Sequence, residues 1–233
     1  MLAELGLYLL SLAAAPSGFR RPLAGAVGLW SRGRRQARAW APHLSACHEV
    51  LLARRATLTR CRSIAILGSG PLFDVPAAEL AKSCDRLYLV DHAHLALPHP
   101  ANATRLWRDL SGPGALGFLG DIPDLDWVIS INLLSQLARV ADDPPATIRT
   151  HLAELDALKV PVTLISDTAY DIRAAGGDLL ETHDLWHGVP VPPAPQNWTW
   201  TVAPPREEGP NARTHAVSAW PDWQGRAKRR RPR

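Results

Sequence analysis

The sequence predicts an α/β fold in which a mostly parallel sheet, covered by helices, ends in an antiparallel hairpin. From residue 63 onward, short runs rich in Val, Ile and Leu alternate with helical segments, which is typical of parallel strands buried on both faces. In the final third the alternation stops. Two strand-like segments follow, and the Pro- and Gly-containing loop between them favours a hairpin over a parallel crossover. With 233 residues, 46% of them hydrophobic and 21% charged, the chain can bury a sizeable core.

Residues 1–62 are expected to form a basic helical extension before the sheet. The apolar run near the N-terminus carries Glu4 where a secretion signal would be basic, and it is too short to cross a bilayer. We therefore expect a buried or amphipathic helix there, with a signal or membrane-surface segment as the alternative. Over residues 30–60, Pro42 predicts a kink or a helix start just before it. Apolar residues at helical spacing predict the buried stripe Ala37, Trp40, Leu44, Cys47 and Leu51.

Seven strands are expected from residue 63 onward. A helix should follow the first strand, with Asp74 as its N-cap and Pro76 in its first turn, and another should cover 144–158. The expected strands are 63–67, 86–91, 103–110, 126–132 and 160–167, followed by the hairpin strands 198–204 and 214–220.

Charge is distributed unevenly along the chain. Residues 19–62 hold ten arginines and one acid, and residues 226–233 hold six basic residues and no acid. Residues 63–225 carry twenty acidic residues and ten basic ones. The basic arms either meet a polyanion such as RNA or pair with the chain's own acidic body.

Polar residues and glycines follow four successive strands of the expected sheet. Gly68 and Gly70 follow the first strand, where only a glycine lets the backbone approach a ligand closely. Asp91 closes the second strand, Asp109 the third and Asn132 the fourth. Open α/β sheets bind their ligands at the carboxyl ends of the strands, so this edge is the predicted site.

This order of elements resembles the class I S-adenosylmethionine-dependent methyltransferases over roughly residues 63–220. The resemblance implies a Rossmann-like, mostly parallel seven-stranded sheet with an antiparallel terminal hairpin, here with an N-terminal helical extension. It also implies S-adenosyl-L-methionine as the cofactor, and Asn132 as the candidate catalytic residue. The cofactor-binding residues that it implies are Gly68, Ser69, Gly70, Asp91, His92, Asp109, Leu110 and Asn132.

The glycine loop departs from the pattern of that family. Ile66 stands where an acidic residue is usual, and Leu72 stands where a third glycine is usual. The sequence therefore predicts a methyltransferase acting on an unidentified acceptor, with a catalytically inactive methyltransferase-like binding or assembly module as the alternative. A nicotinamide-dependent oxidoreductase is a third hypothesis. It is disfavoured by the missing third glycine, by the lack of a Tyr-x-x-x-Lys-like pair and by the hairpin.

The chain is expected to divide into the extension (1–62), the α/β domain (63–222) and a basic, disordered tail (223–233). No metal site is expected, because neither the pair His92 and His94 nor the pair His183 and His187 has an evident third ligand. Three cysteines without metal-like spacing favour a reduced, cytoplasmic setting. Stable membrane insertion is not expected, and a small-molecule or protein acceptor is favoured over RNA.

Overall fold

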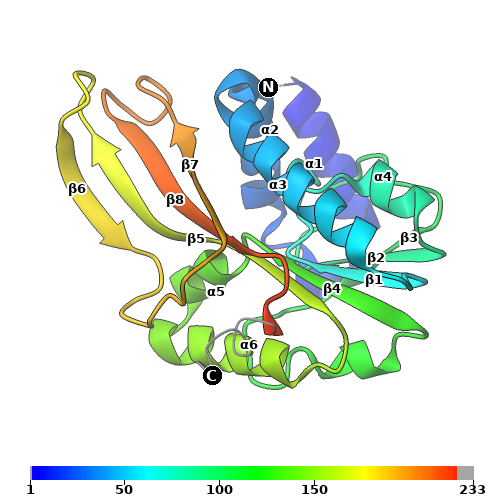
Figure 1. The fold of residues 1–233 in the computed structure, drawn as a ribbon. Coiled ribbons are helices and arrows are strands. Elements are labelled where there is room, and N and C mark those ends of the chain that lie inside the picture. Colours follow the sequence, from blue (N-terminus) through cyan, green and yellow to red (C-terminus); the bar gives the residue numbers. More distant parts are fainter. Residues whose placement is uncertain (1, 225–233) are drawn as a thin grey trace, which may run out of the picture.

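The structure, a computed structural model, describes residues 2–224 (Figure 1). Its helices are α1 (Leu2–Ala14), α2 (Leu23–Arg35), α3 (Ala37–Thr57), α4 (Ala77–Lys82), α5 (Leu134–Val140) and α6 (Pro144–Ala157), with short 3-10 turns η1 (Ser17–Phe19) and η2 (Gly117–Asp121). Its strands are β1 (Ser63–Leu67), β2 (Arg86–Asp91), β3 (Ala103–Trp107), β4 (Leu125–Ile131), β5 (Val162–Arg173), β6 (Leu179–Asp184), β7 (Gln196–Ala203) and β8 (Ala212–Trp220).

One eight-stranded sheet organises the molecule, in the order β3-β2-β1-β4-β5-β8-β7, with β6 paired to β5. Strands β1 to β5 are parallel, and β8 and β7 are antiparallel to their neighbours. The chain runs outward from β1 to β3 and then returns to place β4 on the other side of β1. The order therefore reverses between β1 and β4, and their carboxyl ends form a topological switch point. The predicted fold class, with its reversed terminal hairpin, is confirmed.

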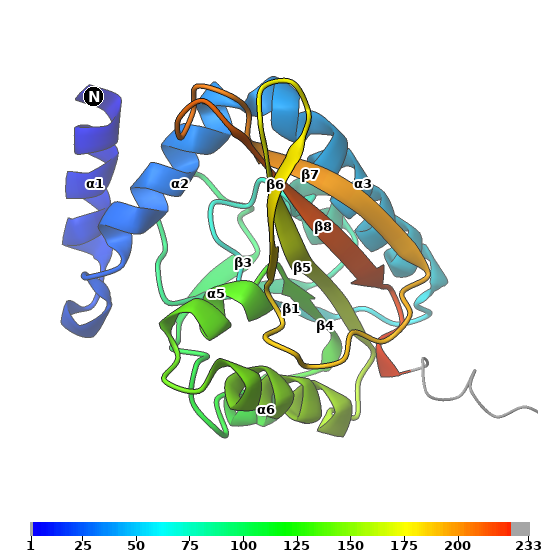
Figure 2. The same cartoon turned by 90° about the vertical axis from the view of Figure 1, so that its left-hand side faces the viewer.

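The far end of β5 was not predicted. Its first half pairs with β4, but β5 continues to Arg173, and residues 169–173 pair with β6 on one side and with β8 on the other. The second half of β5, with β6, β7 and β8, forms an antiparallel wing beyond the carboxyl edge of the parallel strands (Figures 1 and 2). Since β6 is largely exposed and pairs only with β5, its sequence lacks the apolar run that marks the buried strands.

Helices cover both faces of the sheet, as the continuous apolar strands require. On one face, α5 and α6 bury Leu134, Ile148 and Leu155 against β4 and β5. On the other face, α3 and α4 pack against β1, β2 and β4 through a second cluster that includes Leu51 and Leu80. Figure 1 shows these helices on opposite sides of the strands.

The predicted stripe on α3 is partly confirmed. Trp40, Cys47 and Leu51 are buried and Leu44 is half-buried, whereas Ala37 is exposed. The burial of His43 was not predicted. The other buried residue of this face that the sequence analysis did not name is Val50.

Several local predictions were wrong. Helix α4 begins at Ala77 after Pro76, and Asp74 does not cap it but bonds to Asn132. Of the two alternatives predicted at Pro42, a kink or a helix start, the helix start is excluded, because α3 begins at Ala37 and Pro42 lies inside it. Strand β3 ends at Trp107, short of the expected residue 110.

The pair His183 and His187 does not lie on a helix. His183 is in β6, and His187 follows that strand with φ +49°. Within residues 2–224, no group of three or more His, Cys, Asp or Glu side chains is arranged to hold a metal ion.

Helices α1 and α2 form a third cluster against the segment that follows β2. Leu7, Leu23 and Val27 pack on Ala93 and Leu95. The opposite side of α1 is apolar and exposed, at Leu2, Leu5, Leu9 and Leu10. Among the described residues, no helix combines the length and the apolar character that crossing a membrane requires.

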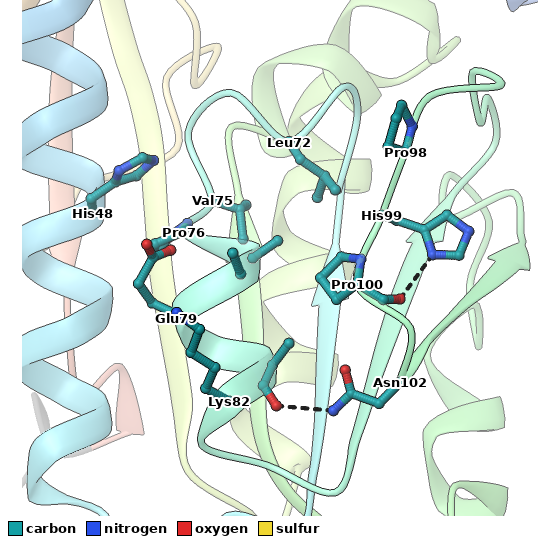
Figure 3. Close-up of a pocket in the computed structure, with 13 residues that line it drawn as sticks. His48, Leu72, Val75, Pro76, Glu79, Lys82, Pro98, His99, Pro100 and Asn102 are labelled. Atoms are coloured by element: carbon teal, nitrogen blue, oxygen red, sulfur yellow. Dashed lines mark hydrogen bonds between the residues drawn. The ribbon is translucent and has the colours of Figure 1, made fainter.

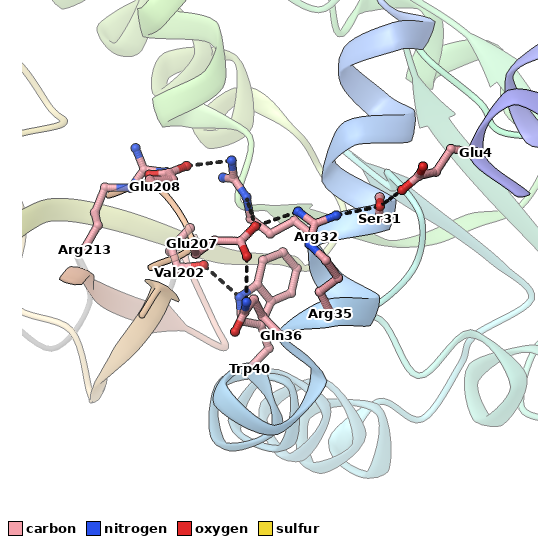
Figure 4. A network of polar contacts seen from close by, with 10 residues as sticks. All are labelled: Glu4, Ser31, Arg32, Arg35, Gln36, Trp40, Val202, Glu207, Glu208 and Arg213. Atoms are coloured by element: carbon pink, nitrogen blue, oxygen red, sulfur yellow. Dashed lines mark hydrogen bonds and ion pairs between the residues drawn. The ribbon is translucent and has the colours of Figure 1, made fainter. Parts of the chain in front are cut away.

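The basic arm pairs with the acidic body at several places, one of which is shown in Figure 4. Arg32 binds Glu208 and Arg35 binds Glu207, each at 2.6 Å, and Glu207 also accepts a hydrogen bond from Gln36 at 2.7 Å. This ionic network ties the end of α2 to the loop between β7 and β8. It accounts for two of the ten arginines of the arm, and elsewhere Arg54 pairs with Asp222 and Arg62 with Asp126.

Of the expected tail, residues 223–233, Trp223 is buried in the core on the α5 and α6 face. Residues 225–233 lie outside the described residues.

Two buried histidines make stability depend on pH. Burial lowers the pKa of His43 to about 3 and that of His151 to about 4, against 6.5 in an exposed side chain. Below pH 6.5 these two histidines are therefore protonated in the unfolded chain but stay neutral in the folded chain. The free energy of unfolding consequently decreases as the pH falls from 6.5 toward 4.

We predict that His151→Gln reduces the pH sensitivity of folding. Between pH 7 and pH 5, the loss in the free energy of unfolding should be smaller than in the unmodified protein by roughly 2 kcal/mol. Urea unfolding at both pH values measures this, with the exposed His99 changed to Gln as the control. An equal loss in all three proteins would contradict the prediction.

Candidate functional site

The glycine loop begins at the switch point with a close backbone contact. Gly68 has φ +77°, and a Cβ atom there would lie 2.8 Å from the carbonyl oxygen of Ile131 and 3.0 Å from Cβ of Leu133. Gly70 also has a positive φ, +47°, but a Cβ atom there would meet only the carbonyl oxygen of Gly68, at 3.9 Å. Gly68 is thus required by the packing of the loop on the end of β4, while Gly70 has open space beside it.

Asp91 at the end of β2 holds this loop in place. Its Oδ2 accepts from the backbone N–H of Gly70 at 2.8 Å, and its Oδ1 accepts from the N–H of Ala93 at 3.0 Å. Nδ1 of His92 lies 3.1 Å from Oδ1. Burial alone would raise the pKa of Asp91, but the hydrogen bonds from His92, Gly70 and Ala93 together outweigh it and lower that pKa. The carboxylate is therefore ionised, and its Oδ2 keeps capacity for a further donor.

Asn132 lies at the opposite side of the switch point, directly after β4. It has φ +46°, is 8% exposed, and donates from Nδ2 to Oδ2 of Asp74 at 2.7 Å. Burial raises the pKa of Asp74. Because Asp74 belongs to the glycine loop, this bond joins the far end of the loop to β4, as Asp91 joins its near end to β2.

Asp109 and Leu110 do not lie beside the glycine loop's hydrogen bonds as Asp91 and Asn132 do. One is exposed and the other is in the core. Asp109 is exposed, two residues beyond β3, and accepts from the backbone N–H of Ser111 at 2.9 Å and from its hydroxyl at 2.6 Å. These hydrogen bonds lower the pKa of Asp109, and the nearby His92 lowers it further. The side chain of Leu110 is buried in the core on the α5 and α6 face, so it is not free to contact a ligand.

Two polar atoms of this edge are buried without a partner among the described residues. They are Oγ of Ser69, in a residue only 1% exposed, and Oδ1 of Asn132. A buried polar atom without a hydrogen bond is costly, and such atoms concentrate where a ligand or water completes them. The hydroxyl can donate or accept, and the amide oxygen accepts, so the pair suits a ligand with an amino or ammonium group.

The N-terminal helices lie beside this edge. The backbone N–H of Ala96 donates to Oγ of Ser11 on α1 at 2.9 Å, and Phe19 contacts the ring of Trp107 at the end of β3. On the other side, Nε2 of His48 on α3 lies 3.1 Å from the carbonyl oxygen of Phe73. The glycine loop is therefore enclosed between the sheet edge and α3.

A surface cavity of about 610 Å³ lies next to the loop but apart from these residues. It runs along α4 between His48 and the segment that ends at Asn102, and its wall is mostly apolar (Figure 3). Leu72 and Val75 of the glycine loop reach it, but none of the eight predicted cofactor-binding residues lines it. The geometry of the strand ends, and not this cavity, therefore defines the candidate site.

Residues that the sequence analysis missed extend the site along the sheet. Asp167 lies on β5 two residues beyond Ile165, the last β5 residue that pairs with β4, and its Oδ2 lies 2.8 Å from Nδ1 of His215 on β8. The rule applied to the first four strands also selects Asp167, because it is the last residue of the expected fifth strand. Nothing in the sequence distinguishes His215 from other strand residues.

Comparison with known proteins adds two distant structural matches. No family model matches the chain, and no curated protein matches it in sequence. One match is to the complex between the Haloferax volcanii Trm112 methyltransferase activator and a candidate methyltransferase, with 16% identity and a TM-score of 0.34. It covers 57% of this chain and 58% of that one. The other is the precorrin-6y C5,15-methyltransferase of Geobacter metallireducens, with 11% identity, a TM-score of 0.26, and coverage of 74% and 86%. Matches at these values carry no information about the function of this chain.

We predict that replacing Gly68 by alanine destabilises the fold more than replacing Gly70 does. Gly68→Ala should lower the free energy of unfolding by roughly 2–4 kcal/mol, because the new Cβ both clashes with Ile131 and takes a positive φ. Gly70→Ala is the matched control with strain but no clash, and should cost about 1 kcal/mol. Chemical denaturation of both variants measures the difference. Equal losses would contradict the packing role of Gly68.

Proposed function

We propose that the chain is an S-adenosylmethionine-dependent methyltransferase whose cofactor lies at the carboxyl edge between β1, β2 and β4. One observation carries the proposal: Asp91, the glycine loop and Asn132 converge at the switch point, where the strand order reverses. The buried, unpartnered Ser69 Oγ and Asn132 Oδ1 support it, since they give the amino-acid part of such a cofactor polar partners.

The residues present fit this cofactor in the following way. Asp91 would bind a ribose hydroxyl through the free capacity of Oδ2. A second hydroxyl would take Oδ1 if His92, which is exposed, turned away. Gly70 leaves open space for the cofactor's chain, and Asn132 and Ser69 would bind its amino-acid end. Asp109 would lie near the adenine, whereas Leu110 would contribute only its backbone.

The cofactor supplies an electrophilic methyl group on its sulfonium, so the chain's own contribution is mainly alignment. Fixing both reactants in one geometry is the part that Gly68 to Gly70, Asp91 and Asn132 would perform. The acceptor must also lose a proton for most nucleophiles, and this requires a base at the edge.

We predict that the chain binds S-adenosylhomocysteine and that Asp91→Asn weakens this binding at least roughly tenfold, because a charge-assisted hydrogen bond is lost. Isothermal titration calorimetry measures both affinities. Asp121→Asn, an exposed change in η2, is the matched control and should bind as the unmodified chain does. A folded protein that shows no binding at millimolar ligand would refute the proposal.

An inactive methyltransferase-like binding or assembly module is the second candidate. It is favoured by Leu72, which occupies the position of the third glycine with φ +62°, a conformation that a branched side chain adopts at a cost. The melting temperature separates the two candidates. A rise of several degrees on adding S-adenosylmethionine supports the enzyme, and no change supports the module.

A further inference from the structure

A row of rings crosses the face of the wing that is turned toward α3. Tyr170 on β5 pairs with His183 on β6 and with His215 on β8, and His215 pairs with Trp200 on β7. Cross-strand partners lie on the same face, so the four rings are neighbours. The centroid of Tyr170 lies 4.4 Å from that of His183 and 5.3 Å from that of His215. His43 of α3 stacks on Trp200 at 4.1 Å, so the row ends against α3.

Asp167 fixes the orientation of His215 within this row. The carboxylate accepts from Nδ1 at 2.8 Å and lies in a residue that is only 5% exposed. Because Nδ1 donates, the hydrogen-bond network assigns the lone pair of the neutral imidazole to Nε2.

The row adjoins the candidate cofactor edge. The backbone N–H of Asn132 donates to the carbonyl oxygen of Ile165 at 2.9 Å, and Asp167 follows two residues later on the same strand. Asp167 therefore lies just beyond the part of β5 that pairs with β4, as Asn132 lies just beyond the end of β4.

Two buried acceptors of the wing lack a partner among residues 2–224. They are Oδ1 of Asp167 and Nε2 of His215. The indole N–H of Trp200 is likewise buried without a partner. A run of lone pairs of this kind is completed by a ligand that brings O–H or N–H donors, and the adjoining rings favour a planar, aromatic one.

We propose that this surface is the methyl-acceptor site, that His215 is its proton acceptor and that Asp167 is the positioning residue behind it. The acceptor is then an aromatic compound with an O–H or N–H group. This inference rests on the function proposed above.

The transfer is a substitution at the methyl carbon. A lone pair of the acceptor's oxygen or nitrogen forms the bond to the methyl carbon, and the carbon–sulfur bond breaks with its electrons left on sulfur. The proton of the acceptor passes to Nε2 of His215. Asp167 stabilises the imidazolium that results, and the proton is later released to solvent.

Three probes that share a benzene ring test the site: phenol with an O–H, aniline with an N–H, and toluene with neither. Each is titrated at millimolar concentration into the 15N-labelled full chain, with and without S-adenosylhomocysteine, while the imidazole nitrogen resonances are followed. We expect phenol or aniline to shift Nε2 of His215 several-fold more than toluene does. The donor that produces the larger shift identifies the oxygen or nitrogen class.

Two variants separate catalysis from structure. Asp167→Asn offers an N–H to Nδ1, so the tautomer of His215 should reverse and the selectivity for phenol or aniline over toluene should disappear while the chain stays folded. Asp121→Asn makes the same chemical change at an exposed position in η2, outside the row, and is the matched control that should keep that selectivity. Equal shifts with all three probes, no shift with any, or unchanged selectivity in Asp167→Asn would overturn the inference. A lack of S-adenosylhomocysteine binding would instead overturn the proposed function.

Discussion

The arrangement of the candidate cofactor edge depends on the hydrogen bonds that the Asp91 carboxylate accepts. By taking the N–H of Gly70 and that of Ala93, one buried side chain fixes both the loop after β1 and the turn after β2. Hydrogen bonds to a charged acceptor are roughly twice as strong as neutral ones, which suits a group that must be ionised while buried. The turn in its place sends Ala93 and Leu95 into the cluster with α1 and α2, so the position of the N-terminal helices follows from the same carboxylate.

A second constraint comes from the length of β5. Because this strand continues beyond the last residue that pairs with β4, the terminal hairpin can rise beyond the carboxyl edge and form the wing. The register of β5 and β8 shifts between Asp167 and Ala169, where the wing begins. Ion pairs between the arginines at the end of α2 and the glutamates of the loop between β7 and β8 join the wing to the N-terminal helices. The candidate site therefore lies among three parts of the chain that are distant in sequence.

The sequence predicted the parallel strands because they are largely buried, and burial leaves a continuous apolar run. It predicted the hairpin from the Pro- and Gly-containing loop between two strand-like segments, although β7 is only partly buried. It did not predict β6, whose side chains are mostly exposed and whose existence depends on pairing with β5. The role of Asp74 was also missed. An acid before a helix usually caps it, but here Asn132, 58 residues away, binds the same carboxylate. Asp91 and the two glycines were predictable from their positions at the strand ends. His215 could be identified only from the structure, which places it against Asp167 on the neighbouring strand.

The central claim is that a cofactor binds at the edge between β1, β2 and β4 and not in the cavity beside α4. Mapping of backbone amide shifts in the 15N-labelled chain on adding S-adenosylhomocysteine tests it most directly. The account predicts the largest changes at Ser69, Gly70, His92 and Asn132. Changes centred on Glu79, Lys82 and Asn102, which line the cavity, or no changes in a folded protein, would contradict it.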